Sequence, residues 1–123
     1  MKTAYICGPM TPRGNRPEAP NPAIEYLLNL RAMIQAAIAL INKGYAPYCP
    51  GLDMQYFLGL PAGETISENI IKAVSMAFLD VSDIIVLLPG WEASEGCQAE
   101  FTRAVELGGM PAYYGVGNVP NEA

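Results

Sequence analysis

The chain has 123 residues, 51% of them hydrophobic and 15% charged, and its formal net charge is −5. This length supports one domain with a single core, and the composition is typical of a folded protein. The negative charge argues against a nucleic-acid backbone as partner, because such binding needs clustered Lys and Arg. The sequence contains no histidine, which excludes Ser-His and Cys-His dyads, histidine bases and His-ligated metals. If the protein is an enzyme, carboxylates must supply its proton and nucleophile chemistry.

The cysteines and the apolar runs bear on location. Cys7, Cys49 and Cys97 are odd in number and far apart, with no CxxC pair. They fit reduced thiols in the core of a cytosolic protein better than a disulfide framework. No uninterrupted apolar run reaches the ~18 residues that a membrane helix needs, and the apolar segment at the start is too short for a secretory signal. The expected location is therefore the cytoplasm.

The first third of the chain predicts a strand, a long loop and a helix. Thr3–Cys7 is a short apolar run that ends at Gly8-Pro9, as a strand followed by a turn does. Residues 11–23 hold four prolines and predict a loop insertion. A helix is expected over Ile24–Lys43 with Gly44 at its C′ position. Its apolar residues Leu27, Leu30, Ile34, Ile38 and Ile41 recur at spacings of three and four.

The middle of the chain predicts a second strand and a second helix. Tyr45–Cys49 is a short apolar run that stops at Pro50-Gly51. Residues 52–64 are rich in Gly, Pro and aromatics and predict another loop. A helix is expected over Ile66–Asp80. The residues of this helix that we expect to face inward are Ile70, Val74, Ala77 and Phe78.

The last third completes the alternation of strands and helices. Ile84–Leu88 is apolar at every position, which is typical of a central parallel strand. A third helix begins at Ser94, a weak fourth strand covers Pro111–Val116, and residues 117–123 form a tail. The pattern predicts an α/β protein. We expect a single domain over residues 1–123 with a Rossmann-like (flavodoxin-like) parallel sheet of four to five strands and helices on both faces.

The segments of unusual composition all follow predicted strands. They are CGPMTPRGN, PGLDMQYF and PGWEASEG, after the first, second and third strand. In parallel sheets ligands bind beyond the carboxyl ends of the strands. We therefore expect the three segments to meet at one edge of the sheet and to form the pocket.

Ser94, Glu95 and Gly96 have the character of a helix start that can accept an anion. Serine is a favoured N-cap, an acid suits the positive end of the helix dipole, and glycine lets a ligand approach the exposed N–H groups. The alternative is an ordinary capped helix. Neither a Walker A pattern nor GxGxxG occurs in the chain, so any phosphate would be held without those loops.

Glu100 lies at the border of the inward face of the third helix. That face is expected to contain Cys97, Phe101, Ala104 and Gly108, while Gln98, Thr102 and Glu106 point outward. A partly desolvated carboxylate costs free energy unless it is paired or used. The alternative is an exposed Glu100 that pairs with Arg103 three residues later.

Several other residues have both a structural and a functional interpretation. Tyr5 fits simple sheet packing, and Trp91 either caps the core or stacks on a flat ligand. Arg13 and Arg16 in the first loop are either solvated or reach an anionic ligand. Asp83, before the third strand, is expected to be a structural turn or cap residue.

Taken together, three segments resemble the nucleoside 2-deoxyribosyltransferase superfamily. They are YICGPMT at residues 5–11, YCPGLDMQY at residues 48–56 and SDIIVLLPGWEASEGCQAEFTRA at residues 82–104. The likeness is closest to small bacterial and phage members that resemble nucleoside 5′-monophosphate N-glycosidases. It spans most of residues 3–108 and leaves out the loop at 11–23 and the tail.

The resemblance implies cleavage of the N-glycosidic bond of nucleosides or their 5′-monophosphates. It implies that Glu100 attacks C1′ of the sugar, that Tyr5 orients this carboxylate, and that Ser94 contacts the 5′ end of the sugar, where serine favours a phosphate. It implies no metal or cofactor, a small-molecule nucleotide or nucleoside as ligand, and a homodimer or larger homo-oligomer. The candidate catalytic residues are Glu100, Tyr5 and Asp53, and the candidate substrate-binding residues are Gly8, Pro9, Met10, Gln55, Trp91, Ser94 and Gly96.

The sequence departs from the family at one position. Family members commonly carry an aspartate where this chain has Ser75, and that aspartate helps to protonate the leaving base. Serine is a poor general acid, so Asp53, a water molecule or an easily departing base would have to substitute.

Three hypotheses about function follow. The first is an N-glycosidase acting on nucleoside or 2′-deoxynucleoside 5′-monophosphates through Glu100. The second is a nucleoside 2-deoxyribosyltransferase that passes the sugar to another base. The third, motivated by Ser75, is a nucleotide-binding or sensing protein without chemistry.

Overall fold

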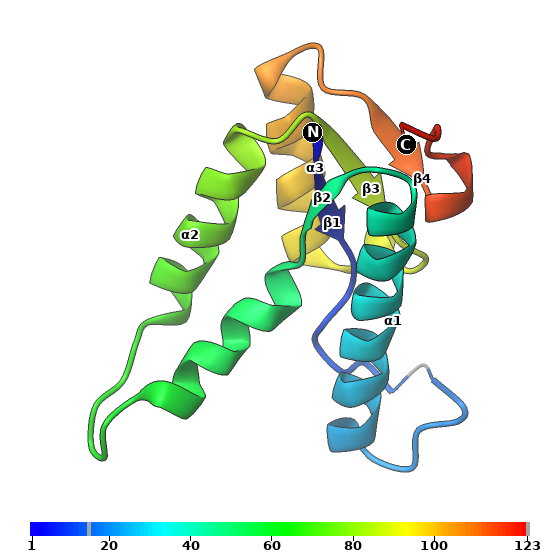
Figure 1. Ribbon diagram of the computed structural model, residues 1–123. Helices are drawn as coiled ribbons and strands as arrows, with labels where there is room; N and C mark the ends of the chain where they lie inside the picture. Colours follow the sequence, from blue (N-terminus) through cyan, green and yellow to red (C-terminus); the bar gives the residue numbers. More distant parts are fainter. Residues whose placement is uncertain (15, 123) are drawn as a thin grey trace.

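The computed structural model describes residues 1–14 and 16–122; Asn15 and Ala123, which belong to the expected loop and tail, lie outside the described residues. The strands are parallel throughout and lie in the order β2-β1-β3-β4. The predicted α/β, Rossmann-like fold with helices on both faces is confirmed (Figure 1). The elements are β1 (Thr3–Cys7), α1 (Pro22–Asn42), β2 (Ala46–Tyr48), η1 (Pro50–Gly59), α2 (Glu68–Asp80), β3 (Ile84–Leu87), η2 (Trp91–Ala93), α3 (Glu95–Leu107), β4 (Ala112–Tyr114) and η3 (Val116–Asn118).

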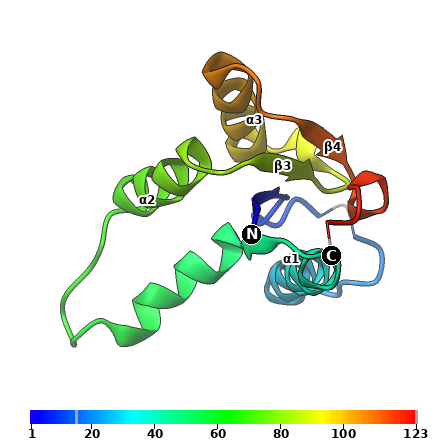
Figure 2. The same cartoon turned by 45° about the horizontal axis from the view of Figure 1, so that its top comes forward.

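The sheet divides the core into two layers because successive strand side chains point to opposite faces. Figure 2 shows α1 on one side of the sheet and α3 on the other. On the α1 side, Ala4 and Ile6 of β1 pack with Met33 and Leu40. The opposite cluster contains Tyr5, Cys7, Leu79, Ile85, Leu87, Cys97 and Ala104. Tyr5 and Cys7 of β1 therefore face the side on which α2 and α3 lie.

Helix α1 begins two residues earlier than expected. Asn21 is its N-cap, and the side chain accepts a hydrogen bond from the Ile24 amide at 3.0 Å. Gly44 follows the helix with a φ of 94°, as expected for C′. The apolar residues whose spacing predicted the helix lie mainly on its outer side: Leu27, Ile34, Ile38 and Ile41 are exposed. The buried side contains Glu25, Asn29, Met33, Ala36 and Leu40.

Helix α1 has the length and composition of a membrane-spanning helix, which the sequence did not predict. With a mean hydropathy of 1.4 and only Glu25 and Arg31 charged, it is long and apolar enough to cross a membrane. The core helix of a soluble protein can have the same length and apolar composition. In this structure Met33, Ala36 and Leu40 of α1 pack in the core beside the sheet.

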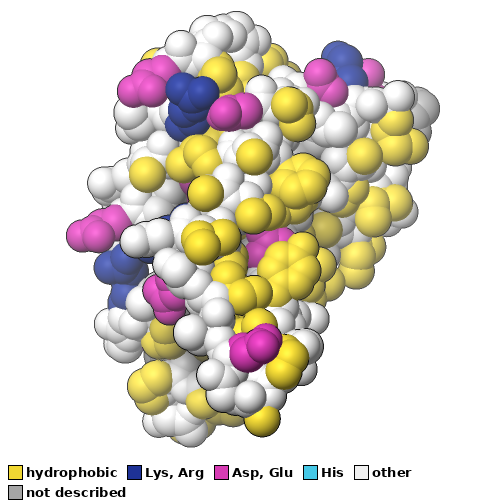
Figure 3. Space-filling model, turned by 90° about the vertical axis from the view of Figure 1, so that its left-hand side faces the viewer, with side chains coloured by type: hydrophobic (Ala, Val, Ile, Leu, Met, Phe, Trp, Pro, Cys, Tyr) yellow, Lys and Arg dark blue, Asp and Glu magenta, His cyan; other side chains and the backbone are white. Residues whose placement is uncertain are grey.

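Helix α2 has its expected position but not its expected orientation. Of the four residues predicted to face inward, Ile70, Ala77 and Phe78 are exposed and Val74 is half-buried. The buried residues are Ile71, Ser75 and Leu79. On this buried side the Ser75 hydroxyl donates to Asp53, and the more apolar stripe lies outside. Figure 3 shows hydrophobic side chains spread over this face of the molecule.

Residues 52–64 were expected to form a loop, and this is wrong for most of them. Pro50–Gly59 form the 3₁₀ helix η1, with Pro50 at its first turn. In both ribbon views η1 and the loop before α2 reach away from the sheet (Figures 1 and 2). Only Gly51 and Asp53 of η1 are buried, so its first turn is the part that meets the core.

The remaining predictions concern Asp83, before β3, and the C-terminal tail. Asp83 is structural, as expected: its Oδ2 accepts hydrogen bonds from the Thr3 amide (2.7 Å) and the Thr3 hydroxyl (3.2 Å). The tail is docked across the end of α1. Lys43 donates to the carbonyl oxygens of Val116 (2.9 Å) and Val119 (2.7 Å), and Val119 is buried.

Candidate active site

The site lies where the topology opens a crevice. From β1 the chain moves to β2 on one side and then to β3 on the other, and ligands bind at such a switch point. The turns after β1 and β3 are packed together here. A Cβ atom at Gly8 would lie 3.0 Å from Leu88, and one at Gly90, where φ is 89°, would lie 3.3 Å from Pro9. Glycine at both positions lets the two turns meet at this edge.

Glu100 extends from α3 toward β1 and is partly buried. Burial raises the pKa of its carboxyl group to about 7, although the Cys7 and Tyr5 side chains favour the ionised form and oppose the shift. Arg103 does not neutralise it, because its guanidinium is paired with Asp80 at 2.9 and 3.2 Å. The alternative of an exposed Glu100–Arg103 pair is therefore wrong. A carboxyl group with a pKa near neutrality and no cationic partner among the described residues is suited to chemistry.

The prediction for the inward face of α3 is confirmed for three of its four residues. Cys97 and Ala104 are buried and Phe101 is partly buried. Gly108 is exposed, because the helix has already ended at Leu107 and Gly108 is its C-cap. Cys7 ties β1 to this helix, since its thiol donates to the Cys97 carbonyl oxygen at 3.6 Å.

Tyr5 stands beside Glu100 and is fully buried. Burial and then the Glu100 carboxylate raise the pKa of its hydroxyl. Among the described residues this hydroxyl has no hydrogen-bond partner. It is close enough to Glu100 to sense the charge and to favour the ionised form of that carboxyl group. A buried hydroxyl without a partner costs free energy, which favours a functional interpretation of Tyr5 over simple sheet packing.

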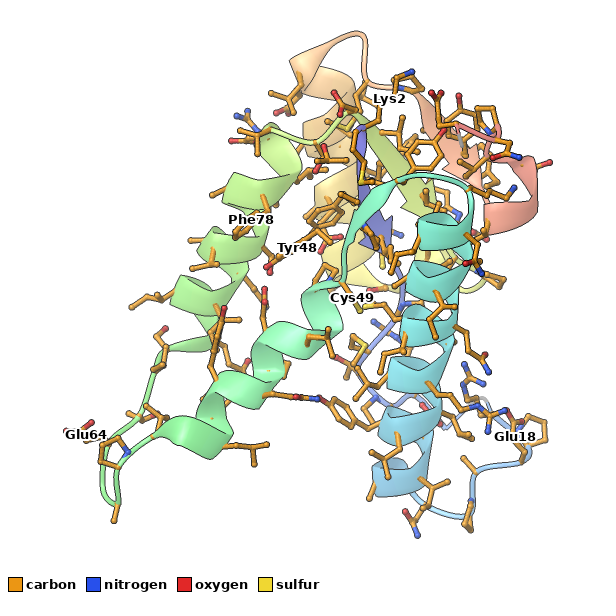
Figure 4. All side chains as sticks on the ribbon, viewed as in Figure 1. Lys2, Glu18, Tyr48, Cys49, Glu64 and Phe78 are labelled. Carbon is orange, nitrogen blue, oxygen red and sulfur yellow. The ribbon has the colours of Figure 1, made fainter. Side chains whose placement is uncertain are left out.

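Asp53 forms a second buried carboxylate on the same side of the sheet. It is 6% exposed and accepts hydrogen bonds from the Tyr48 hydroxyl and from Ser75 Oγ, the latter at 2.8 Å. Tyr48 is in register with Tyr5, and their rings stack with centroids 5.6 Å apart. Figure 4 shows Tyr48 and Phe78 facing each other from β2 and α2, with centroids 4.4 Å apart. The aromatic stack joins the surroundings of Asp53 to those of Glu100.

The start of α3 has the predicted cap. Ser94 is the N-cap, and its hydroxyl accepts from the Cys97 amide at 3.3 Å. Gly96 is exposed, and a Cβ atom there would meet nothing closer than 3.9 Å, so the space beside it is open. The Cys7 thiol and the Ser94 hydroxyl lower the pKa of Cys97, burial opposes them, and Arg13 of the first loop also lowers it. A cation thus lies within electrostatic range of this helix start.

Two residues that hold the first loop were missed by the sequence analysis. Glu25 is buried on α1 and accepts hydrogen bonds from the amides of Arg13 and Gly14, the latter at 2.9 Å. Asn29, also buried, accepts from Arg16 Nε (2.8 Å) and donates to the Met10 carbonyl oxygen (3.2 Å). Glu25, Asn29 and Met33 recur at a spacing of four, which indicates one helix face. The sequence analysis took the more apolar stripe on the other side as the pattern of the helix instead.

A cavity of about 150 Å³ adjoins the switch point on the α1 side. Gly8, Pro9 and Arg16 line it together with Asn29, Ala32, Leu88 and Pro89. Glu100, Tyr5 and Asp53 do not line it. It is therefore a hollow separate from the two carboxylates.

The structure does not bring every candidate residue to the carboxylates. Trp91 packs on Phe101 and Tyr114, with ring centroids 5.0 and 6.0 Å apart, as the core-capping alternative predicts. It also lines a second hollow of about 230 Å³ beside β4. Gln55 is exposed on η1. Met10 packs toward the core on the α1 side.

The fold and the site together define a Rossmann-like α/β protein with a buried carboxylate, Asp53, and a partly buried one, Glu100, on one side of its sheet. The chain belongs to the family described as "Domain of unknown function (DUF4406)", whose model matches residues 2–113. No curated protein matches the chain.

Proposed function

We propose that this protein is an N-glycosidase that hydrolyses the base–sugar bond of nucleoside or 2′-deoxynucleoside 5′-monophosphates. The observation that carries the proposal is the Glu100 carboxyl group, which is partly buried beside the switch point, has a pKa of about 7 and is not paired with Arg103. The resemblance of residues 5–11, 48–56 and 82–104 to the nucleoside 2-deoxyribosyltransferase superfamily points to the same residue.

The proposed reaction has two steps. In the first, Glu100 attacks C1′, the C1′–N bond breaks, its electron pair leaves with the base, and the base takes up a proton from Asp53. In the second, water attacks C1′, the C1′–O bond to Glu100 breaks, and a proton of the water returns to Asp53. The carboxylate traps the positive charge that develops on the sugar. Tyr5 orients Glu100 through its buried hydroxyl.

In the nucleoside 2-deoxyribosyltransferase superfamily, an aspartate at the position of Ser75 protonates the leaving base, and Asp53 can take this role. Ser75 Oγ lies 2.8 Å from Asp53 Oδ2, so a carboxylate from η1 occupies the neighbourhood of the missing aspartate. This contact weakens the argument for a binding protein without chemistry, which rested on Ser75 alone.

A 5′-phosphate is the group that we assign to the start of α3. The Ser94 cap, the open space at Gly96 and the electrostatic reach of Arg13 support this choice. Exposed Glu92 and Glu95 flank the same turn, so the phosphate must rely on N–H donors and Arg13.

The experiment is chromatography of base release from a panel of nucleosides and their 5′-monophosphates. We expect release from a monophosphate to exceed release from its nucleoside by about tenfold or more, because charge-assisted hydrogen bonds are among the strongest contacts. A second free base in the assay separates hydrolysis from transfer. Exchanged nucleotide would identify a transferase, and binding without release from any compound would contradict the proposed enzyme.

We also propose that the protein is a homodimer or a larger homo-oligomer. The resemblance implies it, and exposed apolar side chains on α1 and α2 support it, among them Ile38, Ile41, Ile70 and Phe78. Light scattering behind size exclusion is expected to give at least twice the chain mass of 13.2 kDa. A monomer mass at micromolar concentration would contradict this.

A further inference from the structure

The hydrogen bonds of Asp53 are distributed unevenly between its two oxygens. Tyr48 Oη and Ser75 Oγ both donate to Oδ2. No described residue donates to Oδ1. Oδ1 is therefore the oxygen of Asp53 that is left to contact a ligand.

This distribution determines which oxygen carries a proton. In a carboxylic acid the carbonyl oxygen accepts hydrogen bonds and the other oxygen bears the hydrogen. Ser75 Oγ also lies 3.3 Å from the Ile71 carbonyl oxygen. As long as its single hydrogen is directed to Oδ2, at 2.8 Å, the acid form of Asp53 places its proton on Oδ1. No described Lys or Arg forms an ion pair with this buried group, and burial of an uncompensated carboxylate is costly unless it is used.

The two donors come from rigid positions. Ser75 is buried in the middle of α2. The Tyr48 ring is stacked between Tyr5, at 5.6 Å, and Phe78, at 4.4 Å. The Tyr48 hydroxyl cannot swing away without breaking this stack, so Asp53 Oδ2 is held from β2 and from α2 at once.

We infer that Tyr48 and Ser75 are positioning residues that hold Asp53 Oδ2, so that Oδ1 delivers the proton to the leaving base. This inference rests on the proposed function and replaces the aspartate expected at position 75 by an acid on η1 with a serine as its support. The proton moves from Asp53 Oδ1 to a ring nitrogen of the base as the C1′–N bond breaks. The carboxylate that remains is stabilised by the two hydroxyl donors.

The test compares two leaving groups. One substrate is the nucleotide of the panel that reacts fastest, and the other carries the same base methylated on a ring nitrogen, which gives it a positive charge and lets it leave without a proton. For Tyr48→Phe and Ser75→Ala we expect base release from the unmethylated nucleotide to fall about tenfold, as for loss of a hydrogen bond to a charged group. Asp53→Asn is expected to lower it by about 100-fold, the usual scale of general acid catalysis. Release from the methylated nucleotide is expected to change little in all three variants.

Matched controls lose comparable hydroxyl groups elsewhere. Tyr45→Phe removes the bond from the Tyr45 hydroxyl to the Pro120 carbonyl oxygen (2.9 Å), and Ser82→Ala removes the bond to the Phe78 carbonyl oxygen (2.7 Å). Neither is expected to distinguish the two leaving groups. Equal slowing of both substrates by Tyr48→Phe and Ser75→Ala would overturn the inference and leave the proposed function standing. If the unmodified protein releases neither base, the proposed function fails and the inference fails with it.

Discussion

Replacement of Glu100 by glutamine is expected to lower base release by about 1,000-fold or more, because the amide keeps the shape of the side chain but cannot act as a nucleophile. Tyr5, Cys7 and Ser94 stay in place, so nucleotide binding is expected to persist. The measurement is single-turnover base release at saturating protein, together with calorimetric titration of the nucleotide. Loss of turnover with retained binding is the result that assigns the chemistry to this carboxylate.

The matched control for Glu100→Gln is Glu106→Gln. Glu106 lies on the same helix, is exposed, and makes only a 3.9 Å contact with Arg103. The substitution Glu106→Gln removes the same charge from α3 without changing the site, so base release is expected to stay within about twofold, as for surface substitutions generally. Unchanged turnover in Glu100→Gln would remove the proposed mechanism, whatever the result for Glu106.

The sequence predicted the framework because strands and helices are determined by local pattern. β1 begins and ends at the predicted residues, and the third helix has its cap at Ser94 as predicted. The orientation of a helix is harder to predict when both of its stripes are apolar. The buried side of α2 contains Ser75, which contacts Asp53 of η1, and no local pattern predicts such a contact.

The candidate site divides in the same way. Glu100 was identifiable because it borders a buried stripe on one helix. The partnership of Asp53 with Tyr48 and Ser75 joins η1, β2 and α2, so it depends on how three elements pack. The anchoring of the first loop by Glu25 and Asn29 was missed for a related reason. Buried polar residues on a helix look like its solvent face until their partners are known.

The Glu100→Gln variant is also expected to be more stable than the unmodified protein above neutral pH. Burial raises the pKa of Glu100 from 4.5 to about 7 in the folded protein. The folded state therefore binds a proton more tightly than the unfolded state, and the free energy of unfolding falls as pH rises through this window. The difference between the two pKa values of Glu100 corresponds to about 3 kcal/mol of unfolding free energy. The unmodified protein loses this free energy as Glu100 ionises, and the variant with a neutral glutamine does not.

Urea unfolding at about pH 4 and at about pH 8 measures this difference. The variant and the unmodified protein are expected to have similar stability at the lower pH, where Glu100 is protonated in both states, and to differ by about 3 kcal/mol at the higher pH. Glu106→Gln is expected to show no such trend, and a stability gain for Glu100→Gln that does not depend on pH would contradict the assignment of the shift to burial of this carboxyl group.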